Sequence, residues 1–218
     1  MMNLEVPMKW VRSLIPAELD QIVEKDKGSL IDGLKNIVIS SILPAACVFV
    51  VFLIMGLLVL AVMGTVGSLA KNGASALEKS GLYGGGYALA GIVMAIAIMI
   101  LQPIMFILGT GVHWLLATVF GGKGSYSDHA FYASHIQAGL NILAPIIVFG
   151  FFIPCIGYLI MFLALAYPIY PYYRLIKKVH DLDRVKAAIV VVAPIVIMII
   201  AAVLLCIPYI AAVFAVKW

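Results

Sequence analysis

Charged side chains are scarce in this chain, and their scarcity excludes most classes of soluble protein. Only 11% of its 218 residues are Asp, Glu, Lys or Arg, whereas 65% are hydrophobic. A soluble globular domain has about 25% charged residues, so this chain has too few charges to cover a surface in water. The composition therefore excludes an ordinary cytosolic enzyme, a disordered chain and a nucleic-acid-binding domain, and it indicates an integral membrane protein.

Four long segments contain no charged residue at all: 36–70, 80–122, 129–173 and 187–216. A helix needs roughly 20 apolar residues to cross the hydrocarbon core of a bilayer, and each segment exceeds that length. Their hydrophobic residues do not alternate with polar ones, as the strands of a membrane β-barrel require. Because only helices and closed barrels satisfy their backbone groups in lipid, the sequence predicts an all-α, polytopic membrane helical bundle.

The distribution of basic residues predicts five transmembrane helices. Residues 1–35 and residues 174–186 each carry five Lys or Arg side chains, and few lie between them. Cytoplasmic loops attract Lys and Arg, so both segments are expected on the cytoplasmic side, with an even number of spans between them. One of the two longest charge-free segments, 80–122 or 129–173, must then contain two spans.

Local composition favours a division of 129–173, because Pro154 and Gly157 lie near its middle and such residues are typical of tight turns. Division of 80–122 would distribute the basic residues nearly as well, but its candidate break is Pro103, and a proline can kink a membrane helix without ending it. The expected spans are about 36–67, 87–120, 128–152, 155–173 and 185–216. They form one transmembrane domain, 36–218, with an external carboxyl terminus, after a cytoplasmic segment of residues 1–35.

Two short amphipathic helices are expected before the first span. Apolar residues recur at helical spacing in residues 9–15, which suits either a helix lying on an anionic leaflet or a solvated helix packed on the bundle. A second helix begins at Pro16, because proline suits the first turn. Ser29 and Asp32 have the spacing of a capping box for the first span. Ser127 is expected to be the N-cap of the third span.

Polar residues inside the predicted spans are the candidates for a functional site. Ser134, Gln137 and Asn141 form a stripe along one helical face. Because polar groups that face lipid are costly, this stripe should contact other helices or line a wet cavity that binds a substrate or a lipid headgroup. No acidic residue lies deep in any span, which weakens the case for a proton- or sodium-coupled transporter.

Three histidines join these candidate intramembrane or interface contacts: His113, His129 and His135. His129 and His135 lie on different faces of one helix, so a metal site would need a ligand from another span, and His113 could approach from the second. A hydrogen-bonded structural role is the simpler interpretation. Metal binding by His129, His135 and Asp128 is a testable alternative. His180 lies in the basic loop and is expected to face solvent or headgroups.

The basic segment after the fourth span is the candidate surface for anionic lipid headgroups or protein partners. Its members are Arg174, Lys177, Lys178, Arg184 and Lys186. Residues 121–125 lack the spacing of a phosphate-binding loop and are expected to form a turn, and the glycine-rich residues 81–86 are expected in an external loop. No paired carboxylates, nucleophile elbow or zinc-protease motif is present, so we expect no enzymatic activity, no cofactor and no resident metal.

Several short motifs occur in a characteristic order. They are Pro16-Ala-Glu-Leu-Asp and Lys25-Asp-Lys-Gly-Ser-Leu before the first span, Phe120-Gly-Gly-Lys-Gly-Ser-Tyr and Asp128-His-Ala-Phe-Tyr around the start of the third, and Lys177-Lys-Val-His-Asp-Leu-Asp-Arg before the fifth. This arrangement resembles the Yip domain family (Ypt-interacting proteins) in its prokaryotic form. The resemblance covers about residues 16–210.

The resemblance implies five spans with a cytoplasmic amino terminus, in agreement with the charge distribution. Eukaryotic members of the family act in early secretory trafficking and are associated with small GTPases of the Rab type, so it also implies membrane-protein or GTPase partners. We expect a non-enzymatic protein that organises lipids or partner proteins through its cytoplasmic face, as a monomer or a homo-oligomer, in the plasma membrane of a prokaryote. The alternative is a small transporter or channel built around Gln137, Asn141 and His113.

Overall fold

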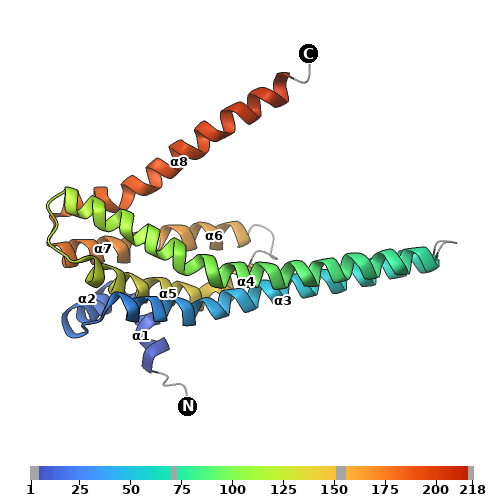
Figure 1. The fold of residues 1–218 in the computed structure, drawn as a ribbon, viewed down its shortest axis with the longest axis horizontal. Coiled ribbons are helices and arrows are strands. Elements are labelled where there is room, and N and C mark those ends of the chain that lie inside the picture. The colour runs from blue at the N-terminus through green and yellow to red at the C-terminus, as the bar shows by residue number, and fades with distance from the viewer. Residues whose placement is uncertain (1–4, 70–72, 151–155, 216–218) are drawn as a thin grey trace.

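The computed structural model describes residues 5–69, 73–150 and 156–215, and these residues form eight α-helices without any strand (Figure 1). The helices are α1 Glu5–Ser13, α2 Pro16–Lys25, α3 Leu30–Leu69, α4 Gly73–Val119, α5 Tyr126–Gly150, α6 Ile156–Ala166, α7 Ile169–His180 and α8 Arg184–Ala215. The predicted all-α class is therefore confirmed, and so are the two short helices before the first span.

Five stretches of the described helices are long and apolar enough to cross a membrane, as the charge distribution predicts. They are Leu30–Met63, Gly81–Val119, Tyr126–Gly150, Gly157–His180 and Arg184–Leu204. Helix α4 continues through Pro103 without a break, so the segment that holds two spans is 129–173. The turn expected at Pro154 lies outside the described residues.

Helix α3 begins at Leu30, directly after the predicted capping box of Ser29 and Asp32. Two other expectations about helix bounds differ from the structure. Helix α4 begins at Gly73, so the glycine-rich residues 81–86 are helical and not an external loop. The physical reason is close packing: a Cβ at Gly84 would lie 2.7 Å from the Leu60 side chain of α3, so this glycine lets two helices approach. The fourth span is divided at Pro168, between α6 and α7.

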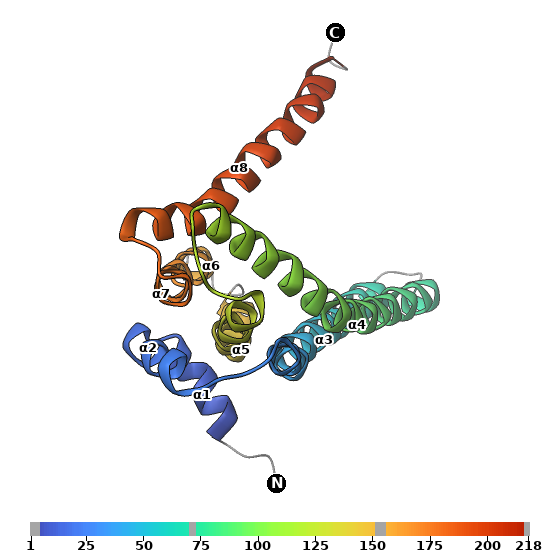
Figure 2. The same cartoon turned by 60° about the vertical axis from the view of Figure 1, so that its left-hand side comes forward.

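Helices α3 and α4 form a long antiparallel hairpin that extends beyond the rest of the molecule, and α5 lies along the first part of α3 (Figure 1). Figure 2 shows α2 beside α7 and α1 beside α5, at the end of the bundle opposite the tip of the hairpin. Helix α8 leaves the bundle at an angle, and its first turns pack on other helices, where Val190 and Val191 are buried with Ala117 and Ile176.

The first half of α5 is the centre of the protein interior, because residues 129–136 are all buried. Side chains from four other helices surround it: Leu19 and Ile22 of α2, Ile37 of α3, Phe106 of α4 and Leu175 of α7. The amphipathic helix α1 also packs here through Trp10, as does Leu14 directly after it, while Val11 of α1 stays exposed. Helix α1 therefore packs on the bundle, as one of the two alternatives predicts. Contact between α1 and a lipid leaflet stays a prediction.

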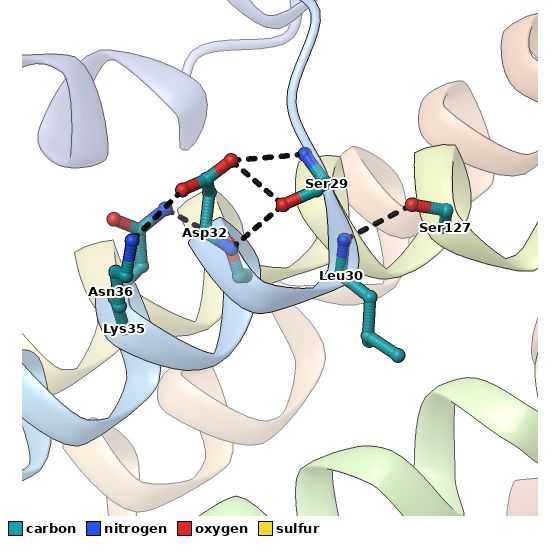
Figure 3. A network of polar contacts seen from close by, with 7 residues as sticks. Ser29, Leu30, Asp32, Lys35, Asn36 and Ser127 are labelled. Carbon is teal, nitrogen blue, oxygen red and sulfur yellow. Dashed lines mark hydrogen bonds and ion pairs between the residues drawn. The ribbon is translucent and has the colours of Figure 1, made fainter.

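The start of α3 is tied to the start of α5 by hydrogen bonds (Figure 3). Ser29 and Asp32 form the predicted capping box, in which Ser29 N donates to Asp32 Oδ2 at 3.1 Å and Asp32 N donates to Ser29 Oγ at 3.2 Å. Leu30 N donates to Ser127 Oγ at 3.0 Å, across 97 positions of sequence. The amino-terminal segment therefore lies at the same end of the molecule as the α4–α5 connection.

The prediction that Ser127 caps α5 is wrong. The cap is Ser125, whose Oγ accepts a hydrogen bond from Asp128 N at 3.1 Å, and this leaves Ser127 to bond α3. The α4–α5 connection also contacts the end of α7, because Lys123 N donates to His180 O at 3.1 Å. The amino-terminal segment, the α4–α5 connection and the end of α7 therefore lie at one end of the bundle. The five-span topology assigns these three segments to one side of the membrane.

Candidate functional site

Two basic residues of α7 are held by acidic residues of α2. Arg174 forms an ion pair with Asp20. Lys178 Nζ lies 2.7 Å from Glu24 Oε1 and donates to Asp20 O at 2.8 Å. The partners are spaced four residues apart on both helices, so the two helices meet along matching faces. Two of the five predicted lipid or partner contacts are therefore engaged within the chain.

The other three basic residues of this segment have weaker internal partners or none. Lys186 Nζ lies 4.0 Å from Asp183 Oδ2, at the limit of an ion pair. Lys177 and Arg184 have no carboxylate partner among the residues that the structure describes. Lys177 is half-buried and Arg184 is exposed. These two cations are consequently available to an external anion without the loss of an internal ion pair.

Asn141 is the centre of a hydrogen-bond network that joins α3, α4 and α5. Its Nδ2 donates to Ser40 Oγ at 2.9 Å. Its Oδ1 accepts from Gln102 Nε2 at 2.6 Å and from Gln137 Nε2 at 3.3 Å. The predicted polar stripe therefore faces other helices, and interhelical hydrogen bonds satisfy most of its polar atoms.

Ser134, the first member of the stripe, accepts a hydrogen bond from Asn36 Nδ2 at 3.0 Å and is fully buried. Asn36, Ser40 and Gln102 belong to the same polar layer, although the sequence reasoning did not select them. The sequence could have identified Gln102 as a candidate, because a glutamine deep inside a charge-free segment requires a polar partner. Its partner could not be identified, since the residues that meet it lie on helices distant in sequence.

Gln137 and His113 line one cavity of about 200 Å³ between α4, α5 and α7. Gln102, Thr110 and Tyr172 supply further polar groups to its wall. Asn141 does not line it. Two of the three residues assigned to a transport site therefore face this cavity, whereas the third serves to join helices.

His129 contacts His180 and not the other histidines named above. His180 Nε2 lies 3.2 Å from His129 Nδ1, and both side chains are fully buried. The expectation that His180 faces solvent or headgroups is therefore wrong. The cause is the α4–α5 connection, whose Gly122 and Gly124 come so close that a Cβ at either would lie within about 3 Å of the His180 ring.

His135 lies apart from this pair. Its Nδ1 is 3.0 Å from Phe131 O, and its ring meets the Phe131 ring edge to face. The carboxylate of Asp128 accepts from Ser125 Oγ at 2.6 Å. Among the residues described, no three His, Cys, Asp or Glu side chains gather in a way that could hold a metal ion. The described residues therefore show no coordinating geometry for metal binding by His129, His135 and Asp128.

Five helices long and apolar enough to cross a membrane define a polytopic helical membrane protein. The family model of the Yip1 domain matches residues 36–205. The chain therefore belongs to the Yip1 domain family, and the resemblance drawn from the order of its motifs is confirmed. No curated protein and no solved structure matches it.

Proposed function

We propose that this member of the Yip1 domain family is a non-enzymatic scaffold that organises membrane lipids or partner proteins through its cytoplasmic face. The observation that carries the proposal is the contact between acidic α2 and basic α7, which orders the face, while Lys177 and Arg184 have no carboxylate partner in the described part of the chain. An anionic headgroup or an acidic protein surface is the ligand that two such cations attract. Membrane proteins and small GTPases are the protein partners that the family suggests.

The proposed orientation places residues 1–35 in the cytoplasm and the carboxyl terminus outside, in the plasma membrane of a prokaryotic cell. It is supported by the gathering of the amino-terminal segment, the α4–α5 connection and the α7–α8 connection at one end of the bundle. An odd number of spans then carries the end of α8 to the other side. The charge distribution selects this end as the cytoplasmic one.

The test is removal of the two available cations. In the Lys177→Gln/Arg184→Gln variant, we expect the affinity for an anionic phospholipid to fall about 10–30-fold, because each basic residue near the surface contributes about 1 kcal/mol. Native mass spectrometry of the purified protein with phosphatidylglycerol measures this affinity, and pull-down of membrane proteins measures partner binding.

The matched control removes two other charges from the same end. Lys9 and Lys35 each form an ion pair with a carboxylate, Asp26 and Asp32, so the Lys9→Gln/Lys35→Gln variant should bind the lipid within about threefold of the unmodified protein. Equal losses in both double variants would show a nonspecific effect of net charge. Unchanged lipid and partner binding in the first variant would contradict the scaffold proposal.

A transport role is the second candidate, and the cavity shared by Gln137 and His113 is the observation that favours it. Reconstituted vesicles would show flux of a candidate solute that decreases with Gln137→Leu. Asn141→Leu should reduce it as well, because Asn141 holds Gln137 in place. An absence of flux, or a flux unaffected by both substitutions, would eliminate this role.

A further inference from the structure

The hydrogen bonds around Asn141 fix how the side-chain amides of Gln102 and Gln137 are oriented. Ser40 donates its one hydroxyl proton to Ile37 O, so its Oγ accepts from Asn141 Nδ2. The Oδ1 of Asn141 must then be the acceptor for Gln102 and Gln137, as observed. Each glutamine therefore gives an amide proton to Asn141 and directs its own acceptor, Oε1, elsewhere.

The two glutamines that carry these acceptors line the cavity between α4, α5 and α7. Gln102 Oε1 is buried and has no hydrogen-bond partner, and Gln102 and Gln137 both line the cavity. His113 Nδ1 lies 2.8 Å from Gly109 O. A carbonyl can only accept, so the ring proton is on Nδ1, and Nε2 carries a lone pair. The wall thus has three acceptor-bearing side chains and no carboxylate, and its donors are the Tyr172 hydroxyl and the second amide proton of each glutamine.

An apolar groove of about 470 Å³ adjoins this cavity, and Gly109, His113 and Tyr172 line both. It lies between α4, α7 and α8, and it follows α8 from Val191 to Met198, into the apolar span. Its further walls are aliphatic. A polar chamber with unpartnered acceptors therefore lies beside an apolar groove, and the headgroup and the acyl chain of one lipid need two such neighbouring sites.

The depth of the cavity also fits a lipid headgroup. On α3, Ser40 lies five residues beyond Lys35, which is about 7 Å at the rise of an α-helix. On α7, Tyr172 lies two residues before Arg174. The cavity is therefore just inside the level of the last charged side chains, where the headgroups and glycerol of a bilayer lie.

We propose that the cavity and the groove together bind one phospholipid whose headgroup carries a primary ammonium as its hydrogen-bond donor, with an acyl chain in the groove. The donors satisfy Gln102 Oε1, Gln137 Oε1 and His113 Nε2. A quaternary trimethylammonium headgroup has no N–H and cannot do so. This site is separate from the surface cations of the scaffold proposal, so the Lys177→Gln/Arg184→Gln variant leaves it intact.

Two glycines of α4 offer a matched pair of variants that test the site. A Cβ at Gly109 or at Gly111 meets no other atom within 4 Å, so neither position excludes a side chain at its Cβ. Gly109 lines the cavity and the groove, whereas Gly111 lines neither. Gly109→Leu therefore fills the site, and Gly111→Leu adds the same side chain to the same helix outside it. Thermal unfolding of both variants confirms that they fold.

The measurement is native mass spectrometry of the purified protein with equal amounts of phosphatidylethanolamine and phosphatidylcholine that carry the same acyl chains. We expect the unmodified protein and Gly111→Leu to retain phosphatidylethanolamine at least about tenfold better, Gly109→Leu to lose this preference, and His113→Phe to reduce it several-fold. Equal retention of the two lipids by the unmodified protein, or an unchanged preference in Gly109→Leu, would overturn the proposal. Displacement of the lipid by free ethanolamine at millimolar concentration would overturn the assignment of a lipid as the occupant.

Discussion

Asp20 of α2 is ion-paired with Arg174 of α7, 154 positions later in the chain. The pair joins the amino-terminal segment to the basic segment before the last span, which are the two segments that the charge distribution assigns to the cytoplasm. Beside it, Lys178 reaches back to both Asp20 and Glu24. The face proposed to meet partners is therefore ordered by contacts between charges and is not a collection of independent loops.

Loss of this ion pair should loosen α2. The side chains are 36% and 24% exposed, so Asp20→Asn or Arg174→Gln should cost about 1 kcal/mol or less. Hydrogen exchange should become faster in Pro16–Lys25 while the apolar spans keep their protection. Lys35→Gln, which removes an ion pair within α3, is the control. The exchanged pair Asp20→Arg/Arg174→Asp should recover part of the protection, and unchanged exchange in every variant would show that the ion pair does not hold α2.

The buried pair of His129 and His180 should contribute to stability through its hydrogen bond. His180→Leu leaves His129 Nδ1 without a partner in the interior, which costs about 1–3 kcal/mol. His180→Gln keeps a polar group in the same place and should cost less. Thermal unfolding in detergent measures both. Equal melting temperatures for the two variants would indicate that the contact is packing alone.

The α3–α4 hairpin depends on glycines where its helices approach. A Cβ at Gly56 would lie 2.9 Å from the carbonyl oxygen of Gly84. A backbone atom cannot move aside easily, so Gly56→Ala should destabilise the protein by about 1–3 kcal/mol. A Cβ at Gly85 meets open space, and Gly85→Ala should be neutral or stabilise by about 0.5–1 kcal/mol. Chemical unfolding of both variants should therefore give opposite signs, and the same sign would contradict the close approach.

Asn141 should matter more for stability than Gln137. Asn141→Leu removes three interhelical or intrahelical hydrogen bonds, to Ser40, Gln102 and Gln137, whereas Gln137→Leu removes one of them. Hydrogen bonds inside a membrane contribute about 0.6–2 kcal/mol each, so the first variant should unfold at a clearly lower denaturant concentration. Indistinguishable unfolding midpoints would show that Asn141 does not carry the network.

The number of spans could be predicted from composition and charge. A long charge-free segment indicates a membrane span, and clustered basic residues indicate the cytoplasmic side. Ends of helices were harder to predict. The glycines of 81–86 have the composition of a loop, and only the neighbouring helix α3 shows that one of them, Gly84, serves close packing. Pro168 separates α6 from α7, whereas α4 continues through Pro103, and a proline alone does not tell these two outcomes apart.

The candidate site was predicted in part. The helical spacing of Ser134, Gln137 and Asn141 correctly indicated contacts with other helices, because it requires only the periodicity of one helix. The partner of His129 could not be predicted in this way. His180 lies 51 positions away, in a segment whose charges suggest exposure. Its burial depends on two glycines of the α4–α5 connection, and no local pattern reports such a contact.

The central claim is that the backbone crosses the membrane five times, with the proposed contact surface in the cytoplasm. Reporters that are active on one side only, fused in turn before Met1, within the α7–α8 connection and after Trp218, test it most directly. We predict cytoplasmic signals at the first two positions and an external signal at the third. A common location for the two ends of the chain, or a connection at Asp181–Asp183 that lies outside, would contradict the topology and the functional proposal that depends on it.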